Sequence, residues 1–159
     1  MSLAHKNGLI TGACGGLGKA IAEAALIEGA NVVVCDIRQE VIDDFKQNIS
    51  AAYPECTLVL KCDITKDSAL DDMFKQAKEK FGHLDFVVNC AGMMDRFDPI
   101  GDVERSMWDR VMALNLTAPA MVTKRAVDLM IETNVKGAIV NIASIAGMLA
   151  IKKTIKPVL

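Results

Sequence analysis

Short apolar runs along the chain alternate with longer segments in which apolar residues recur every three or four positions. The run at 8–10 predicts a first buried strand, and residues 17–28 show the spacing of an amphipathic helix that ends at Gly29. The same two patterns predict further strands at 31–36, 56–62, 84–89 and 137–142, and further helices at 39–52, 65–81 and 104–133. Strands and helices therefore alternate along most of the chain.

This alternation predicts an α/β fold: a doubly wound parallel sheet of about five strands with helices on both faces, as in Rossmann-like domains. In such sheets ligands bind where the strand order reverses, here expected between the first and fourth strands. We place this domain at residues 1–147. Residues 148–159 carry three lysines and Pro157 without a regular period, and we interpret them as a divergent tail.

The long helix predicted at 104–133 raises two local expectations. Asn115 shares one helical stripe with Trp108, Val111 and Met112, so all four side chains are expected to face the core. Pro119 lies inside the segment and is expected to bend it, because proline removes one backbone hydrogen bond.

Composition and charge narrow the classes of function. The 159 residues are 52% hydrophobic with a net charge of −2 and no basic stripe, so nucleic acid and anionic membranes are not expected partners. No apolar run reaches the ~18 residues that span a bilayer. The five cysteines form no Cys-x-x-Cys pair, which favours reduced thiols in a cytoplasmic protein. His5 and His83 lack partners at ligand spacing, so no metal site is expected.

A glycine-rich turn joins the first strand to the first helix, and residues 11–18 read Thr-Gly-Ala-Cys-Gly-Gly-Leu-Gly. Glycines allow the backbone to turn sharply and approach a pyrophosphate, which the free N–H groups of the helix N-terminus then bind. The candidate cofactor-binding residues of this turn are Gly12, Cys14, Gly16, Leu17 and Gly18. The alternative is a plain structural turn, for which glycine is equally suited.

An acidic residue, Asp36, follows Gly16 by 20 residues and ends the second strand, with Ile37 beside it. That spacing suits a carboxylate that binds the ribose hydroxyls of an adenine dinucleotide. A carboxylate there repels the additional phosphate of NADP, so NAD is the favoured cofactor and NADP the less favoured one. Arg38 is close enough to offset part of this repulsion, although it is equally interpreted as a solvated residue at a helix start.

These motifs together resemble the short-chain dehydrogenase/reductase family, over residues ~6–147. The pattern Thr-Gly-x-x-x-Gly-x-Gly at 11–18 resembles its cofactor loop, and Asp63-Ile64 is similar to its adenine-contacting pair. Asn89-Cys90-Ala91-Gly92 resembles its Asn-Asn-Ala-Gly signature, with Cys90 in the second position. The resemblance implies cofactor contacts for Asp63, Ile64, Asn89, Ala91 and Gly92. It implies catalytic roles for Asn115 and for Ser144, which ends the segment 141–144.

Each of these residues also has an ordinary structural interpretation. Asp63 or Thr65 can cap the following helix, because both are common helix-start residues. Residues 89–92 can form a simple turn after a strand. Asn115 can be a core amide with satisfied hydrogen bonds, and a serine such as Ser144 is common at strand ends.

The resemblance implies an oxidoreductase that transfers hydride between NAD(H) and a small alcohol or ketone. In the family a Tyr-x-x-x-Lys motif beyond the serine supplies the proton, but the only tyrosine here is Tyr53, before the third strand. The chain therefore looks C-terminally truncated, and we expect it to be nearly inactive unless another segment supplies Tyr and Lys. The alternative is a non-catalytic module that binds NAD or a partner, and an unstable by-product is a third possibility. A homodimer would form through the helix at 104–133.

Overall fold

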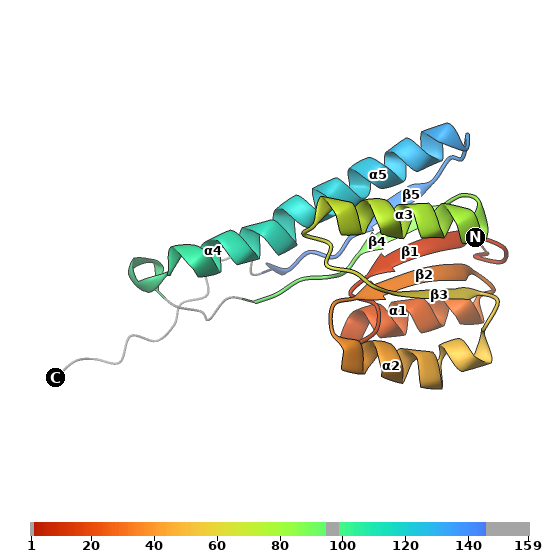
Figure 1. Ribbon diagram of the computed structural model, residues 1–159, viewed down its shortest axis with the longest axis horizontal. Helices are drawn as coiled ribbons and strands as arrows, with labels where there is room; N and C mark the ends of the chain where they lie inside the picture. Colours follow the sequence, from red (N-terminus) through yellow and green to blue (C-terminus); the bar gives the residue numbers. More distant parts are fainter. Residues whose placement is uncertain (1, 95–98, 146–159) are drawn as a thin grey trace.

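The computed structural model of the protein describes residues 2–94 and 99–145. Its centre is a five-stranded, wholly parallel sheet with the strand order β3-β2-β1-β4-β5 (Figure 1). The strands are β1 (Asn7–Thr11), β2 (Asn31–Asp36), β3 (Thr57–Lys61), β4 (Phe86–Asn89) and β5 (Ala138–Asn141). The predicted doubly wound parallel sheet is confirmed. The predicted tail and the boundary that begins it at 148 lie outside the described residues.

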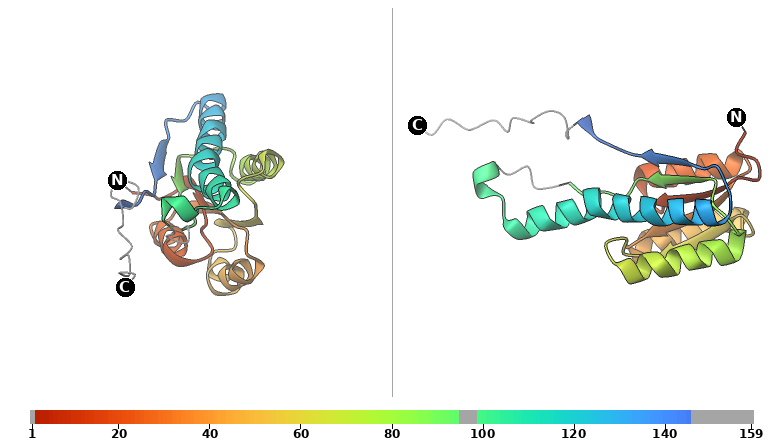
Figure 2. Two further views of the ribbon diagram at one scale, coloured as in Figure 1. Left: turned by 90° about the vertical axis from the view of Figure 1, so that its left-hand side faces the viewer. Right: turned by 90° about the horizontal axis from the view of Figure 1, so that it is seen from above.

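Helices cover both faces of this sheet, with α1 and α2 on one side and α3 and α5 on the other (Figures 1 and 2). The helices are α1 (Gly16–Ile27), α2 (Gln39–Asn48), α3 (Asp67–Phe81), α4 (Arg105–Met112) and α5 (Ala118–Glu132). Residues 2–94 and 99–145 also contain short turns of 3-10 helix at Ser50–Ala52 and Ile100–Asp102 and a π turn at Ala113–Thr117. None of the helices in the described ranges is long and apolar enough to cross a bilayer.

Two separate cores form because each strand sends alternate side chains to opposite faces of the sheet. Val32 and Val34 of β2 pack with Phe45 of α2, whereas Val33 packs on the opposite face with Leu70 of α3. All three valines are fully buried, so burial on both faces explains why the sequence of β2 is an unbroken apolar run instead of an alternating one.

The strand order reverses between β1 and β4. From β1 the chain passes outward to β2 and β3 and then returns across the sheet to β4 and β5. The helices that follow β1 and β4 therefore leave towards opposite faces, and the space between the two strand ends stays open. The expected crevice between the first and fourth strands is thus present, at the carboxyl edge of the sheet.

Two expectations for the helices are wrong. Lys66, not Thr65, is the N-cap residue of α3, because the Thr65 hydroxyl donates instead to Oδ1 of Asp63 at 2.7 Å. Trp108 and Asn115 are not in the core: both are exposed, Trp108 by 50%. Trp108 belongs to α4, which extends beyond the carboxyl edge of the sheet (Figure 2). Asn115 lies on the π turn Ala113–Thr117, which interrupts the regular helical period on which the expectation depends.

The proline predicted to bend the long helix lies at the start of α5, directly after the π turn. Pro119 has no N–H, so it leaves the carbonyl of Asn115 without its usual α-helical partner. A π turn is the local rearrangement that accommodates such a defect, and π turns are frequent at functional sites.

An ion pair between the half-exposed Lys6 and the buried Asp85 lies at the amino edge of the sheet. The Asp85 carboxylate is 9% exposed and accepts hydrogen bonds from the Lys6 ammonium at 2.8 Å and the Asn7 N–H at 2.9 Å. His83 Nε2 lies 3.2 Å from the same carboxylate. Burial alone raises the pKa of Asp85, but the hydrogen bonds from Lys6 and Asn7 outweigh it and hold the pKa below its ordinary value.

We predict that Asp85→Ala lowers the free energy of unfolding by about 1–3 kcal/mol at pH 7, because it leaves the Asn7 N–H and the Lys6 ammonium without their acceptor. The folded-state pKa lies below the unfolded one, so this stabilisation is present above about pH 4 and disappears as the pH falls through the folded-state pKa. Urea unfolding at several pH values measures both effects.

The matched control is Asp128→Ala, which breaks an exposed pair with Lys124 and should cost about 0.5 kcal/mol or less. Equal losses in the two variants at pH 7, or a loss in Asp85→Ala that does not shrink with acidification, would contradict the proposed role of Asp85.

Candidate cofactor site

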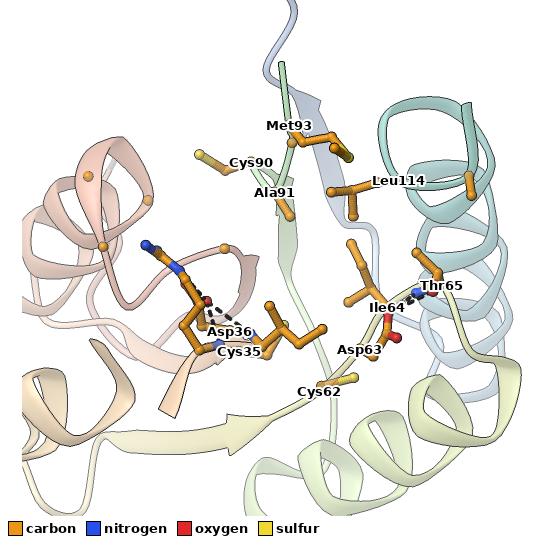
Figure 3. Close-up of a pocket in the computed structure, with 18 of the residues that line it drawn as sticks. Cys35, Asp36, Cys62, Asp63, Ile64, Thr65, Cys90, Ala91, Met93 and Leu114 are labelled. Carbon is orange, nitrogen blue, oxygen red and sulfur yellow. Dashed lines mark hydrogen bonds and ion pairs between the residues drawn. The ribbon is translucent and has the colours of Figure 1, made fainter. Parts of the chain in front are cut away.

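A cavity of about 1030 Å³ opens at the carboxyl edge of the sheet, over the reversal point between β1 and β4 (Figure 3). It is large enough for a dinucleotide, since ligand pockets commonly measure roughly 300–1,000 Å³. Ten of the predicted cofactor-binding residues line it: Gly12, Gly16, Leu17, Gly18, Asp36, Ile37, Asp63, Ile64, Ala91 and Gly92. Four predicted site residues, Cys14, Asn89, Asn115 and Ser144, are not among the residues that line it.

The glycine turn approaches other backbone so closely that two positions exclude a side chain. Gly12 has a φ of +63°, and a Cβ there would lie 2.8 Å from the Cα of Ala91. A Cβ on Gly18 would overlap the carbonyl oxygen of Gly12. The turn thus brings the N-terminus of α1, which begins at Gly16, to the cavity wall with its first N–H groups available to an anion.

The hydroxyl of Thr11 ties this turn to the segment that follows β4. Its oxygen accepts hydrogen bonds from the N–H groups of both Cys90 and Ala91, each at 3.1 Å. Thr11 is 1% exposed. In the sequence, Thr11 stands out only as the first residue of the glycine motif. Its structural signal is a hydroxyl at the last position of a buried strand, next to the reversal of strand order.

The Asp36 carboxylate lies at the end of β2, 7% exposed, and lines the cavity. Its Oδ1 accepts hydrogen bonds from the Ile37 N–H at 2.9 Å and from the Arg38 N–H at 3.1 Å. Arg38 Nε adds an ion pair at 3.3 Å, and this hydrogen bond raises the pKa of Arg38. Arg38 is therefore more than a solvated residue at a helix start, because it helps to hold the carboxylate.

The second carboxylate, Asp63, is held in a similar way at the end of β3. Its Oδ1 accepts the N–H of Thr65 at 3.0 Å and the Thr65 hydroxyl, while the adjoining Ile64 is 5% exposed. Asp63 precedes the N-cap residue of α3 by three positions, so it organises the loop into the helix and does not cap it. Figure 3 shows Asp36 and Asp63 at neighbouring strand ends, below Ala91 and Leu114.

All five cysteines are free, and three of them, Cys35, Cys62 and Cys90, line the cavity. Burial, followed by the nearby Asp36 carboxylate, raises the pKa of Cys14 to about 12. Burial also raises the pKa of Cys90. A hydrogen bond from the Cys35 thiol to Cys62 raises the pKa of Cys35 and lowers that of Cys62. Cys14, Cys35 and Cys90 are therefore neutral thiols near pH 7, and thiolate chemistry is not expected of them.

Asn89 lies beneath the cavity and joins β4 to its neighbours. Its Nδ2 donates to Oδ1 of Asn141 in β5 at 2.8 Å and to the Thr123 hydroxyl of α5 at 3.2 Å. Its Oδ1 is buried and has no hydrogen-bond partner among the described residues. Asn89 thus joins β5 and α5 to β4, and its cofactor contact stays a prediction.

Asn115 is exposed and lies on the π turn, where its side chain brackets one residue of the loop after β4. Oδ1 accepts the Met93 N–H at 2.9 Å, and Nδ2 donates to the Met93 carbonyl at 2.8 Å. The carboxamide therefore fixes Met93, which lines the cavity beside Gly92. Ser144 is exposed beyond the end of β5, two positions after Ile142, which also lines the cavity.

Further residues line the cavity that no sequence motif indicated. They include Lys66 at the N-terminus of α3 and Asp109, Arg110, Ala113 and Leu114 of the long helix. Among the described residues there is no cluster of His, Cys, Asp or Glu that could hold a metal ion.

The family model for short chain dehydrogenases matches residues 6–155, which is most of the chain. The chain belongs to the short chain dehydrogenase family. A curated relative, the short chain dehydrogenase/reductase dpfgG of Gibberella zeae, is 48% identical over 145 residues, covering 90% of this chain but 53% of the relative. The chain thus spans about half the length of this relative.

Solved structures agree with this assignment. A 3-ketoacyl-(acyl-carrier-protein) reductase from Brucella melitensis, complexed with NADH, matches with a TM-score of 0.84 and 28% identity over 92% of this chain and 61% of its own. An NAD⁺-bound xylitol dehydrogenase matches with a TM-score of 0.84 and 29% identity over 94% of this chain and 57% of its own. Members of the family therefore carry a nicotinamide dinucleotide on this same fold.

We predict that Thr11→Val lowers the free energy of unfolding by about 1–3 kcal/mol, because it leaves the N–H groups of Cys90 and Ala91 without an acceptor at nearly unchanged side-chain volume. Amide hydrogen exchange at Ala91 should become faster. Thr133→Val is the control, since that hydroxyl makes one hydrogen bond, to the Leu129 carbonyl, at the far end of α5. Unchanged exchange at Ala91 would show that the hydroxyl does not hold the β4 segment.

Proposed function

We propose that this chain binds NAD(H) in the cavity at the carboxyl edge of the sheet. The observation that carries the proposal is the Asp36 carboxylate, buried, oriented by two N–H groups and placed in the same cavity as the glycine turn. A carboxylate in this position accepts hydrogen bonds from the ribose hydroxyls while the start of α1 binds the pyrophosphate. Gly12 and Gly18 fit this role, because side chains there would fill the cradle.

The finer preference is for NAD over NADP. The Asp36 carboxylate would lie against the additional phosphate of NADP, and burial strengthens that repulsion. Arg38 Nε already forms an ion pair with Oδ1 of Asp36 at 3.3 Å, so the Arg38 guanidinium offsets the repulsion of the additional phosphate only in part.

For the chemistry, we propose the reaction class of the family: hydride transfer between the nicotinamide and a small alcohol or ketone. The cofactor supplies the hydride, and the protein must position the carbonyl and move a proton. Ser144 would hold the substrate oxygen. Asn115 would support the proton relay. Its two hydrogen bonds to the Met93 backbone fix the part of the cavity wall that Met93 forms.

The proton donor is the part of this chemistry that the described cavity does not contain. The only tyrosine, Tyr53, follows the 3-10 turn after α2 and packs against the core between α1, α2 and the sheet. It is not among the residues that line the cavity. We therefore propose that the 159-residue chain binds the cofactor but turns over alcohols and ketones very slowly unless another segment supplies the acid.

A homodimer through the helices at 104–133 remains part of this proposal. Support comes from apolar side chains that stay exposed along α4, the π turn and α5: Trp108, Leu116, Val127 and Ile131. Exposed apolar side chains along one continuous helical segment are typical of association surfaces.

We predict that isothermal titration of the chain with NAD gives saturable binding, and that Asp36→Ala weakens it by about tenfold or more, the loss of a charge-assisted hydrogen-bond acceptor of roughly 1.5–3 kcal/mol. NADH oxidation with a panel of small ketones should stay within background. Absence of any heat of NAD binding to the unmodified chain would contradict the proposal. Ordinary rates of ketone reduction would show that another group replaces the tyrosine as proton donor.

We further predict that Asp36→Ala narrows the preference between NAD and NADP, whereas Arg38→Ala widens it by weakening NADP more than NAD. The reason is that Asp36 repels and Arg38 attracts the same additional phosphate. Parallel titrations of both variants with both cofactors measure the two ratios. Lys19→Ala is a charge-matched control, because Lys19 pairs with Asp44 and neither residue lines the cavity. An unchanged ratio in both variants would contradict the assignment of the ribose site.

A further inference from the structure

The helical phase of α4 brings an unexpected side chain to the cofactor cavity. The buried face of α5 contains Ala118 and Val122, and regular α-helical steps back from it lead to Asn115, Val111 and Trp108. A π turn adds about one residue to the turn, so the face shifts by about one position.

The side chains that line the cavity agree with this shift. Leu114 and Arg110 line the cavity, and each lies one position before the residue expected for an uninterrupted helix, Asn115 and Val111. Ala113, the neighbour of Leu114, lines the cavity as well. Their spacing of three and four residues places them on one helical face. The π turn therefore directs Arg110 towards the cavity, one helical turn outward from Leu114.

Most charges around the cavity already have partners. Asp36 is paired with Arg38, Asp109 with Arg105, and Oδ1 of Asp63 is held by Thr65. Within residues 2–94 and 99–145, the two cations that line the cavity without an ion pair are Lys66 and Arg110. Lys66 is the N-cap residue of α3 and Arg110 lies in α4. The positive charge without an ion pair is therefore on the cavity walls near Asp63 and Leu114.

Apolar side chains that suit a flat ring share the cavity with Arg110. Ile64, Ala91 and Leu114 line the same cavity, and Figure 3 shows Leu114 pointing towards Ile64. A guanidinium is planar and weakly hydrated, so it stacks on aromatic faces better than an ammonium does. An aliphatic wall followed by a guanidinium is thus a suitable enclosure for a purine.

We propose that Arg110 is a further cofactor-binding residue, whose guanidinium plane stacks on the adenine ring that Ile64 and Leu114 enclose. This inference rests on the proposed NAD(H) binding. The pyrophosphate would occupy the start of α1 and the ribose Asp36, so the base lies beyond Asp36, towards Asp63 and Ile64 on the next strand end. Arg110 therefore acts on the adenosine half and not on the nicotinamide half.

The test is a set of titrations of the 159-residue chain with NAD, ADP-ribose and nicotinamide mononucleotide. Arg110→Ala should weaken NAD and ADP-ribose by the same factor, about three- to tenfold, and leave nicotinamide mononucleotide unchanged. Arg110→Lys should recover little of the loss, because an ammonium keeps the charge but not the plane. Lys75→Ala removes one exposed charge of α3 that does not line the cavity, and should change each affinity less than about twofold.

Three results would overturn the inference while NAD binding stands: unchanged affinities in Arg110→Ala, an equal loss for nicotinamide mononucleotide, or full recovery in Arg110→Lys. Failure of the unmodified chain to bind NAD would overturn the proposed function itself, together with this inference. Because Arg110 is exposed, its variants should keep the thermal unfolding midpoint of the unmodified chain, and circular dichroism verifies this.

Discussion

The close approach of backbone at the ends of β1 and β4 is the constraint on which the rest of the site depends. The Thr11 hydroxyl bridges to two N–H groups after β4, and Gly12 leaves no room for a side chain against Ala91. With these two strand ends fixed, α1 and the loop after β4 leave on opposite sides, and the space between them becomes the cavity. The family's glycine turn is therefore as much a packing requirement as a ligand-binding one.

The sequence was sufficient to predict the fold because the strands carry strong and local signals. Val32, Val33 and Val34 form an unbroken apolar run, which is explained only by burial on both faces of a parallel sheet. The glycine turn and Asp36 follow the ends of such strands. Because the carboxyl ends of parallel strands meet at one edge of the sheet, the topology alone predicted that both lie at that edge. The turn and the two carboxylates could thus be assigned to one cavity without coordinates, and all three line it.

What the sequence could not reveal depends on interactions that do not follow a regular period. The stripe through Trp108 and Asn115 assumes 3.6 residues per turn, but the π turn at Ala113–Thr117 breaks that assumption. Pro119 was the only signal of the defect, and it indicated a bend without specifying which face would turn inward. Thr65 failed as a cap for a related reason, since its hydroxyl is taken by Asp63, a competition that residue preferences do not resolve.

The carboxylates of the cavity are oriented before any ligand arrives, and this bears on how selective the site can be. Oδ1 of Asp36 already accepts from Ile37 and Arg38, so the direction of its other oxygen is set by the fold. A ribose that meets a fixed acceptor loses less free energy to ordering than one that must order a mobile side chain. The same hydrogen bonds would keep Asp36 from turning away from an additional phosphate, and the proposed preference for NAD over NADP rests on this fixed orientation.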